Sequence, residues 1–167
     1  MLAKITVSRT PEPIEVNNFQ EAIEILQSEE FFMAIGEFIF RFSQLEYLLK
    51  STLASYLKLR DDQFDVVVGP YDFAMLLTVA EKTIKLDFDR EYHPALKTFF
   101  NRCRKLNQEV RVVVAHGSWT TAGARYASRQ SLEAKMHFEK PENLAKAAAE
   151  AVKLIDEFAR FGAVANS

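Results

Sequence analysis

The chain is poor in several residue types, and each shortage excludes a class of protein. Its single cysteine, Cys103, rules out an intrachain disulfide and a metal site built from several cysteines. Five glycines and five prolines in 167 residues are too few for a loop-rich or disordered chain. No apolar run reaches the ~18 residues of a membrane span, and the start has none long enough for a signal peptide. We therefore expect a cytoplasmic protein without a membrane segment.

Apolar residues, in contrast, are abundant. Hydrophobic residues make up 49% of the chain and include 14 phenylalanines, which is enough to bury one core of ordinary size. We expect an N-terminal arm over residues 1–17, in which Ile5 and Val7 form a short strand. A single domain is then expected over residues 18–167.

The charges are divided unevenly along the chain, although the net charge is only −2. Residues 1–89 hold 8 Lys or Arg against 15 Asp or Glu, whereas residues 90–140 hold 10 against 4. The second segment is basic, which indicates a surface that attracts a polyanion such as nucleic acid. The alternative is that these residues are ordinary solvated charges on helix surfaces and do not share a face.

Apolar residues at spacings of three and four predict two helices in the first part of the domain. The first begins near Asn18, which can cap it together with Glu21. The second covers about residues 30–59 and carries the strongest apolar stripe of the chain. A helix this apolar over so many turns is either central or pairs with another subunit.

The same apolar spacing of three and four residues predicts three further helices. Asp61-Asp62 and Gly69-Pro70 enclose a connection, and a third helix is predicted over about residues 71–86. Its expected buried face consists of Phe73, Leu76, Leu77, Ala80 and Ile84. A fourth helix starts at Pro94 and ends before Gly117, and the last helix opens at Pro141.

Between the last two helices the apolar pattern changes to alternation. Residues 132–138 read as a strand, and residues 119–121 are its expected hairpin partner. Residues 122–131 would then form an exposed loop that carries Arg125, Tyr126 and Arg129. The expected fold is an all-α bundle of about five helices with a small β-hairpin before the last helix.

The strongest candidate site is a pair of residues at the end of the fourth helix, Arg111 and His116. A guanidinium fork suits two phosphate oxygens, and an imidazole at a helix C-terminus is a suitable proton carrier. Arg102, Arg104 and Lys105 on the same helix can attract a polyanion. Five residues on a straight helix leave the pair about 140° apart, so they share a face only if the helix unwinds near Gly117 or the arginine folds around it. A second subunit could also complete the site. From the spacing alone, a capping histidine and an ion-paired arginine are the simpler interpretation.

The segment Leu106–Trp119, with the sequence LNQEVRVVVAHGSW, resembles the signature segment of HEPN-domain proteins, a family named for "higher eukaryotes and prokaryotes nucleotide-binding". The family motif is an arginine, four to six further residues, and a histidine that is often followed by glycine. Arg111, His116 and Gly117 match these positions. The helical layout also resembles the family, with Glu46 inside the apolar face of a long early helix.

The resemblance implies a helical homodimer that binds RNA or cleaves it without a metal or cofactor. Many members of the family are toxins or defence proteins, which implies an antitoxin-like protein partner. Val112 departs from the pattern, because the family's ribonucleases usually carry a polar residue directly after the arginine. The alternative is a non-catalytic module of the same fold, which uses its apolar helix for dimerisation or partner binding.

The hypothesis of a HEPN-type RNA-binding protein also predicts functions for several other residues. A carboxylate at the edge of an apolar stripe needs a partner, and we expect Glu46 to pair with Arg111 unless it is exposed or bound elsewhere. Arg125, Tyr126 and Arg129 would contact the RNA backbone and stack on an unpaired base. The three histidines are scattered and have no carboxylate cluster beside them, so no metal site is expected.

Overall fold

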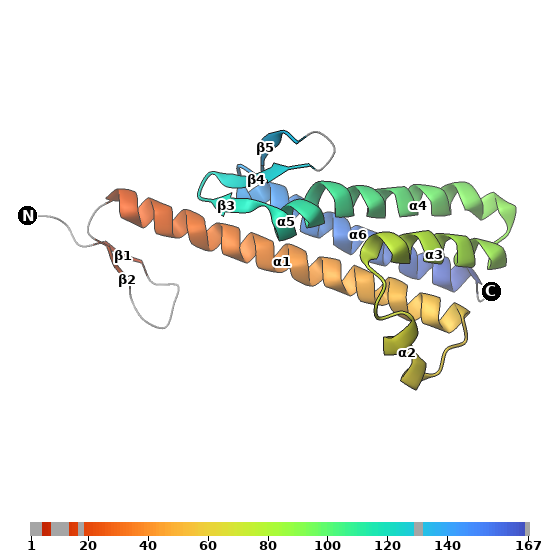
Figure 1. The fold of residues 1–167 in the computed structure, drawn as a ribbon. Coiled ribbons are helices and arrows are strands. Elements are labelled where there is room, and N and C mark those ends of the chain that lie inside the picture. Colours follow the sequence, from red (N-terminus) through yellow and green to blue (C-terminus); the bar gives the residue numbers. More distant parts are fainter. Residues whose placement is uncertain (1–4, 8–13, 17–18, 129–131, 166–167) are drawn as a thin grey trace, which may run out of the picture.

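The computed structural model describes residues 5–7, 14–16, 19–128 and 132–165. It is mostly helical, with five helical rods and a small three-stranded antiparallel sheet before the last helix (Figure 1). This agrees with the predicted class of fold. The predicted cap at Asn18 and the predicted RNA contact at Arg129 lie outside the described residues.

Helix α1, Phe19–Tyr56, is one continuous rod of 38 residues, so the prediction of two helices in this part of the chain was wrong. The polar run from Gln27 to Glu30 suggested a boundary, but it contains neither glycine nor proline, and nothing in it interrupts the backbone hydrogen bonds. The helix ends where Lys58 adopts a left-handed conformation, with φ 53°, and Leu59 N donates to Ala54 O over 3.0 Å.

The connection expected after α1 is itself a short helix, α2, Asp61–Val67. It buries none of its own residues, so apolar spacing gives no signal for it. Helix α3, Phe73–Asp87, is capped by the Asp72 carboxylate, which accepts from Met75 N over 2.7 Å. Its buried residues are the five that the sequence predicts.

The fourth rod contains three consecutive segments. A 3₁₀ turn, Arg90–Tyr92, leads into α4, His93–Leu106, with Pro94 in its first turn as predicted. A π-helical segment, Asn107–Arg111, follows, and α5, Val112–His116, completes the rod. β-Branched residues such as Val112 are mediocre helix formers, and the wide turn lies directly before them.

The small sheet has the order β3-β4-β5, formed by Ser118–Thr120, Gly123–Ala127 and Ala134–His137. The sequence predicts a two-stranded hairpin and an exposed loop over residues 122–131, so the middle strand β4 was missed. Gly123 permits the tight β3–β4 turn, because its φ is +114° and a Cβ atom there would lie 2.6 Å from His137 O.

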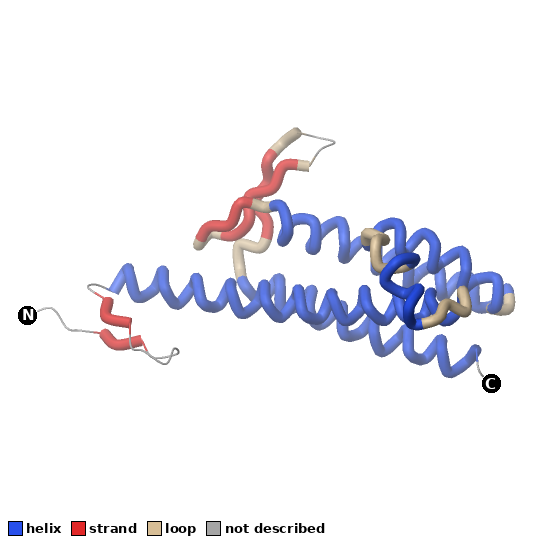
Figure 2. The backbone as a smooth tube through the Cα atoms, turned by 60° about the horizontal axis from the view of Figure 1, so that its bottom comes forward, coloured by secondary structure: helices blue, strands red, loops and turns tan. Residues whose placement is uncertain are grey.

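Helix α6, Pro141–Ala165, runs along α1 and α4 and completes the bundle (Figure 2). A single hydrophobic core joins α1, α3, α4 and α6, with Phe38, Phe99 and Phe100 among its fully buried side chains. Strands β1, Ile5–Val7, and β2, Ile14–Val16, pair as a separate antiparallel ribbon beside the start of α1. Within the described ranges, no helix is long and apolar enough to cross a membrane.

Candidate functional site

The end of α5 is fixed by a glycine in a crowded position. Gly117 N donates to Val113 O over 2.7 Å, and β3 begins at the next residue. A Cβ atom on Gly117 would lie 2.6 Å from Val113 O and 3.2 Å from the Cβ of Ala124. The backbone of Gly117 is extended, with φ −73°, so glycine is needed here for close packing rather than for a left-handed turn. The predicted helix end at Gly117 is confirmed.

Trp119 anchors the sheet to the end of this helix. Its Nε1 donates to Val114 O over 3.2 Å and so satisfies one of the last carbonyls of α5. Its ring stacks on Phe138, with centroids 6.1 Å apart, and also contacts Phe31 of α1 at 6.0 Å. The residues that follow His116 are therefore held between the sheet and the longest helix.

The π-helical segment lies before the Arg111–His116 pair and not between its members. Val112 N donates to Asn107 O, which is the wide hydrogen bond of a π turn. Such turns often occur at functional sites. Residues 112–116 are α-helical, so Arg111 and His116 remain about 140° apart around the helix axis. The helical backbone of a single chain therefore does not place the two residues on one face.

Neither member of the pair has a partner in the part of the chain that the structure describes. Arg111 is half-buried and His116 is exposed. Among the residues that the structure describes, neither side chain has a hydrogen bond or an ion pair. A guanidinium and an imidazole that no protein group neutralises are available to a ligand, and a phosphate is the group that both can bind.

Glu46 does not hold Arg111 as the sequence predicts. Its Oε1 lies 2.9 Å from the Nζ of Lys50, one turn further along α1. Lys50 also donates to Gly69 O over 3.1 Å, which ties the end of α2 to α1. The predicted pairing is wrong because a closer cation on the same helix occupies the carboxylate.

Arg102 is a structural residue in this fold. Its guanidinium binds two glutamates of α6, Glu150 at 2.7 Å and Glu157, and so joins α4 to α6. Burial lowers the pKa of Arg102, but the hydrogen bonds that it donates to the two glutamates outweigh this and raise it. The role in RNA binding expected for Arg102 is not supported, because two carboxylates already occupy it.

Arg104 is occupied in the same way. It donates to Glu81 of α3 over 2.6 Å, and Glu81 also binds Lys85. Burial raises the pKa of the Glu81 carboxyl, but its bonds to Lys85 and Arg104 prevail and lower it. Lys105 differs, since its side chain is exposed and lies 3.9 Å from the equally exposed Glu109. Of the three basic residues predicted on α4, only Lys105 remains open to a polyanion.

Arg125 and Tyr126 are neighbours on β4, so their side chains point to opposite faces of the sheet. Arg125 is exposed, whereas Tyr126 is half-buried, and its ring lies 6.3 Å from that of His137. The sequence predicts that both lie on one loop and act together. The strand separates them instead.

A cavity of about 490 Å³ lies between the π segment and the sheet. Its lining includes Gln108, Val110 and Val113 from the helix and Tyr126, Lys135 and His137 from the sheet. The register pairs Tyr126 with Lys135, and His137 with Ala124, which puts these side chains on one face. Lys135 and His137 were not predicted as site residues, although the alternating pattern of β5 gives them a common face. Neither Arg111 nor His116 lines this cavity.

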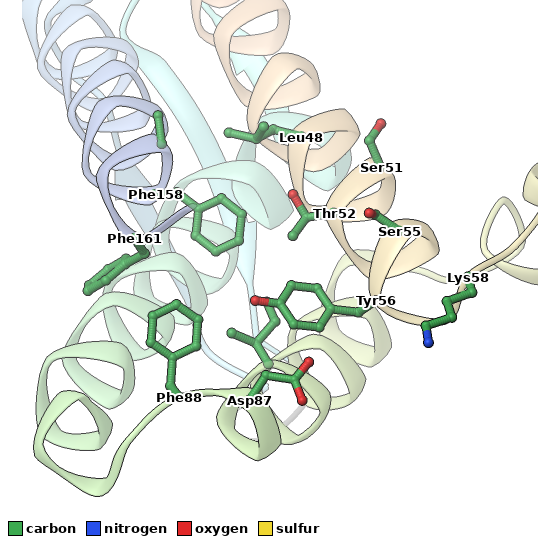
Figure 3. Close-up of a pocket in the computed structure, with 12 residues that line it drawn as sticks. Leu48, Ser51, Thr52, Ser55, Tyr56, Lys58, Asp87, Phe88, Phe158 and Phe161 are labelled. Carbon is green, nitrogen blue, oxygen red and sulfur yellow. The ribbon is translucent and has the colours of Figure 1, made fainter. Parts of the chain in front are cut away.

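A second cavity, of about 720 Å³, lies at the other end of the bundle, between the ends of α1, α3 and α6 (Figure 3). Phe88, Phe158 and Phe161 form one wall, and the Tyr56 hydroxyl points toward them (Figure 3). Burial, followed by the charge of Asp87, raises the pKa of Tyr56. The lining contains both Lys58 and Asp87, so its charge does not select an anionic or a cationic ligand.

In comparisons with protein-family models, curated proteins and solved structures, no significant match to this chain is found. The described residues also contain no group of three or more histidine, cysteine or acidic side chains arranged to hold a metal ion.

Proposed function

We propose that the chain is a HEPN-type protein that binds RNA as a homodimer and cleaves it without a metal. In this role it would act as a toxin or a defence component and would be controlled by an antitoxin-like protein. The resemblance of residues 106–119 to the family's signature motivates the proposal. The fold described above, with the motif at a helix end and a small sheet before the last helix, is compatible with it.

One observation carries the proposal. Arg102 and Arg104 on the same rod are bound by glutamates, whereas Arg111 and His116 have no partner among the described residues. An unpaired arginine that is half-buried loses part of its hydration without receiving an ion pair in return. An anionic ligand such as a phosphodiester would supply that missing partner.

The reaction is a transesterification. The ribose 2′-oxygen attacks the adjacent phosphorus, a new 2′-O–P bond forms, and the P–O5′ bond breaks. The products are a 2′,3′-cyclic phosphate and a 5′-hydroxyl, and no water is consumed. Arg111 stabilises the negative charge on the non-bridging phosphate oxygens. His116 takes the proton from the 2′-hydroxyl or gives one to the leaving 5′-oxygen.

A second copy of the chain is part of this proposal. Arg111 and His116 of one chain point in directions about 140° apart, so they cannot bind one phosphate from a straight helix. Two chains together contribute two arginines and two histidines. One histidine would then act as the base and the other as the acid.

Cleavage in the presence of a chelator tests the proposal. Purified protein is incubated with a mixed-sequence RNA and excess EDTA beside a His116→Ala variant. We expect cleavage by the wild type and a loss of about 100-fold or more in the variant, which lacks the proton carrier. His116 is exposed, so its removal should leave the melting temperature unchanged. Intact RNA with the wild type, or equal cleavage by the variant, would contradict the ribonuclease proposal.

The alternative function is a non-catalytic module of the same fold that acts by dimerisation or partner binding. Val112, directly after Arg111, favours it, because its side chain cannot hydrogen-bond to RNA or orient the arginine. Under this alternative the wild type forms a dimer or a complex, and RNA incubated with it stays intact.

A further inference from the structure

Helix α1 exposes an apolar face on the side opposite the bundle. Phe32, Met33, Phe40 and Tyr47 are between 58% and 73% exposed, although they belong to the longest helix of the protein. Ile39, at 43%, lies at the edge of the same face. These five residues form what we call the α1 outer face. Exposed apolar residues gathered along one helix mark an interaction surface more often than scattered ones do.

The outer face repeats every seven residues. Met33, Phe40 and Tyr47 follow one another at this spacing, and so do Phe32 and Ile39. The buried side of α1 has the same repeat in Phe31, Phe38 and Leu45, which face the core of the same chain. A seven-residue repeat keeps a seam of side chains aligned along a second helix. Helix α1 therefore carries two helix-packing seams. Among the described residues, the core covers one of them, and α2 touches the other at its end, where the ring of Phe64 lies 6.1 Å from that of Tyr47.

Small residues lie between the large ones on this face. A Cβ atom on Gly36 would meet nothing within 4 Å, and Ser43, seven residues later, is also exposed. Large side chains beside small ones form ridges and grooves into which another helix can fit. The glycine also allows the backbone of that helix to approach closely.

The order of residues on the face is nearly symmetric about a point between Ile39 and Phe40. If two α1 helices run antiparallel and cross there, Phe32 lies opposite Tyr47, and Gly36 lies opposite Ser43. An aromatic residue then faces an aromatic one, Ile39 faces Phe40, and small residues face small ones, whereas Met33 lies opposite Glu46. This is the property that a two-fold symmetric interface requires, because the same patch is used by both subunits.

Charge also favours this orientation. The first half of α1, residues 19–38, contains five glutamates and no lysine or arginine. The second half contains Arg41 and Lys50 against one glutamate, Glu46. Parallel helices would place ten glutamates side by side, whereas antiparallel helices place each acidic half beside a half with a net positive charge.

The area is large enough for a stable pair. A large apolar side chain presents about 200 Å² when fully exposed, so the five residues offer about 600 Å² on each chain. A standard stable interface buries about 800 Å² on each partner. The polar residues beside the apolar stripe would supply the remainder.

We propose that the α1 outer face binds the same face of a second copy of this chain, with the two α1 helices antiparallel and crossing between Ile39 and Phe40. This interface is separate from the shared site of the proposed function, because the face lies on the side of α1 opposite the bundle that carries Arg111 and His116. It rests neither on that shared site nor on RNA cleavage.

The mass of the protein in solution gives the first test. By light scattering the wild type should have twice the chain mass of 19.1 kDa, and Phe40→Glu should have the single mass. Leu86→Glu is the matched control, since Leu86 is 84% exposed on α3 and lies outside the face. It should remain a dimer. A monomeric wild type, or a dimeric Phe40→Glu variant with an unchanged circular dichroism spectrum, would overturn the proposal.

Cross-linking tests the orientation. Gly36→Cys and Ser43→Cys are mixed under oxidising conditions, with the buried Cys103 inaccessible in both. Antiparallel helices in this register should give disulfides between the two variants when mixed. Each variant alone should give few, because identical positions lie about 10 Å apart along the axis. Self-linking of each variant would indicate parallel helices and contradict the proposed geometry.

The two proposals fail separately. A dimer with these cross-links that leaves RNA intact would refute cleavage and keep the interface. RNA cleavage that depends on His116, from a protein that stays dimeric in the Phe40→Glu variant, would refute the interface and keep the nuclease.

Discussion

Two groups of basic residues on one helical rod meet different surroundings. Arg102 and Arg104 lie where α4 packs between α3 and α6, and both neighbouring helices offer glutamates. Arg111 and His116 lie about two and about three turns beyond Arg104, where the rod contacts the small sheet. The first group links α4 to α3 and α6, and the second has no partner among the described residues. The same residue types therefore serve as structural ties or as candidate ligand-binding groups according to which element lies beside them.

The pairing of Arg102 and Arg104 with glutamates changes the interpretation of the basic segment, residues 90–140. The sequence has 10 Lys or Arg against 4 acidic residues over residues 90–140, which suggests an extended surface for a polyanion. In the fold, Glu81, Glu150 and Glu157 come from outside that segment and neutralise part of it. The segment therefore presents less uncompensated positive charge than its sequence alone suggests.

The largest expected effect separates the two groups by activity. Arg111→Ala should lower RNA cleavage by about 100-fold or more, because the phosphate charge loses its partner in the transition state. Arg102→Ala should cleave at the wild-type rate at a temperature where both variants are folded. Rates measured with labelled RNA in EDTA check this. Equal losses in the two variants would show that the contrast between the two groups has no functional meaning.

The second expected effect is on the free energy of unfolding, which should depend on an ion-paired basic residue more than on an exposed one. Arg102→Ala should lower the free energy of unfolding by about 2 kcal/mol, because Glu150 and Glu157 are left side by side without their shared cation. Urea denaturation followed by circular dichroism measures the change. Lys105→Ala is the control on the same helix, and its exposed side chain should contribute less than about 0.5 kcal/mol. A similar loss in both variants would argue against a tie between α4 and α6.

The smallest effect concerns Glu81 and depends on pH. Glu81→Gln should lower the free energy of unfolding at neutral pH by about 1 kcal/mol, since the charged carboxylate binds both Arg104 and Lys85. Its pKa is lower in the folded protein, so this stabilisation is present at neutral pH and is lost as the pH falls through the folded-state pKa.

The difference between wild type and Glu81→Gln should therefore shrink as the pH falls below the ordinary glutamate value of about 4.3. Denaturation curves at a series of pH values measure it. Glu109→Gln is the control, and because its side chain is 63% exposed it should change the free energy of unfolding at neutral pH by less than about 0.5 kcal/mol. A gap for Glu81→Gln that stays constant down to acidic pH would contradict the ion-pair assignment.

Features set by neighbouring residues could be predicted from the sequence. The buried face of α3 from Phe73 to Ile84, the start of α6 at Pro141 and the end of α5 at Gly117 all follow from spacing or from a residue's own backbone preference. Helix α2 and strand β4 could not be predicted in this way. The first buries nothing, and the second is short and depends on a tight turn at Gly123.

The site was less predictable because it depends on partners that are remote in the sequence. Arg102 binds glutamates 48 and 55 residues away, and Arg104 binds one that is 23 residues away. No local pattern connects these positions. Glu46 shows the reverse error, since a distant partner was expected and the real one, Lys50, lies one helical turn away.

The π segment Asn107–Arg111 is equivalent to one extra residue inserted into an α-helix. A chain that lacked one of these five residues would continue α4 directly into α5, and every side chain after that point would rotate by about 100°. The direction in which Arg111 and His116 face is thus set by the length of this stretch as well as by its composition. Surface loops tolerate insertions and deletions. In this segment, a change of one residue would rotate Arg111 and His116 together around the helix axis.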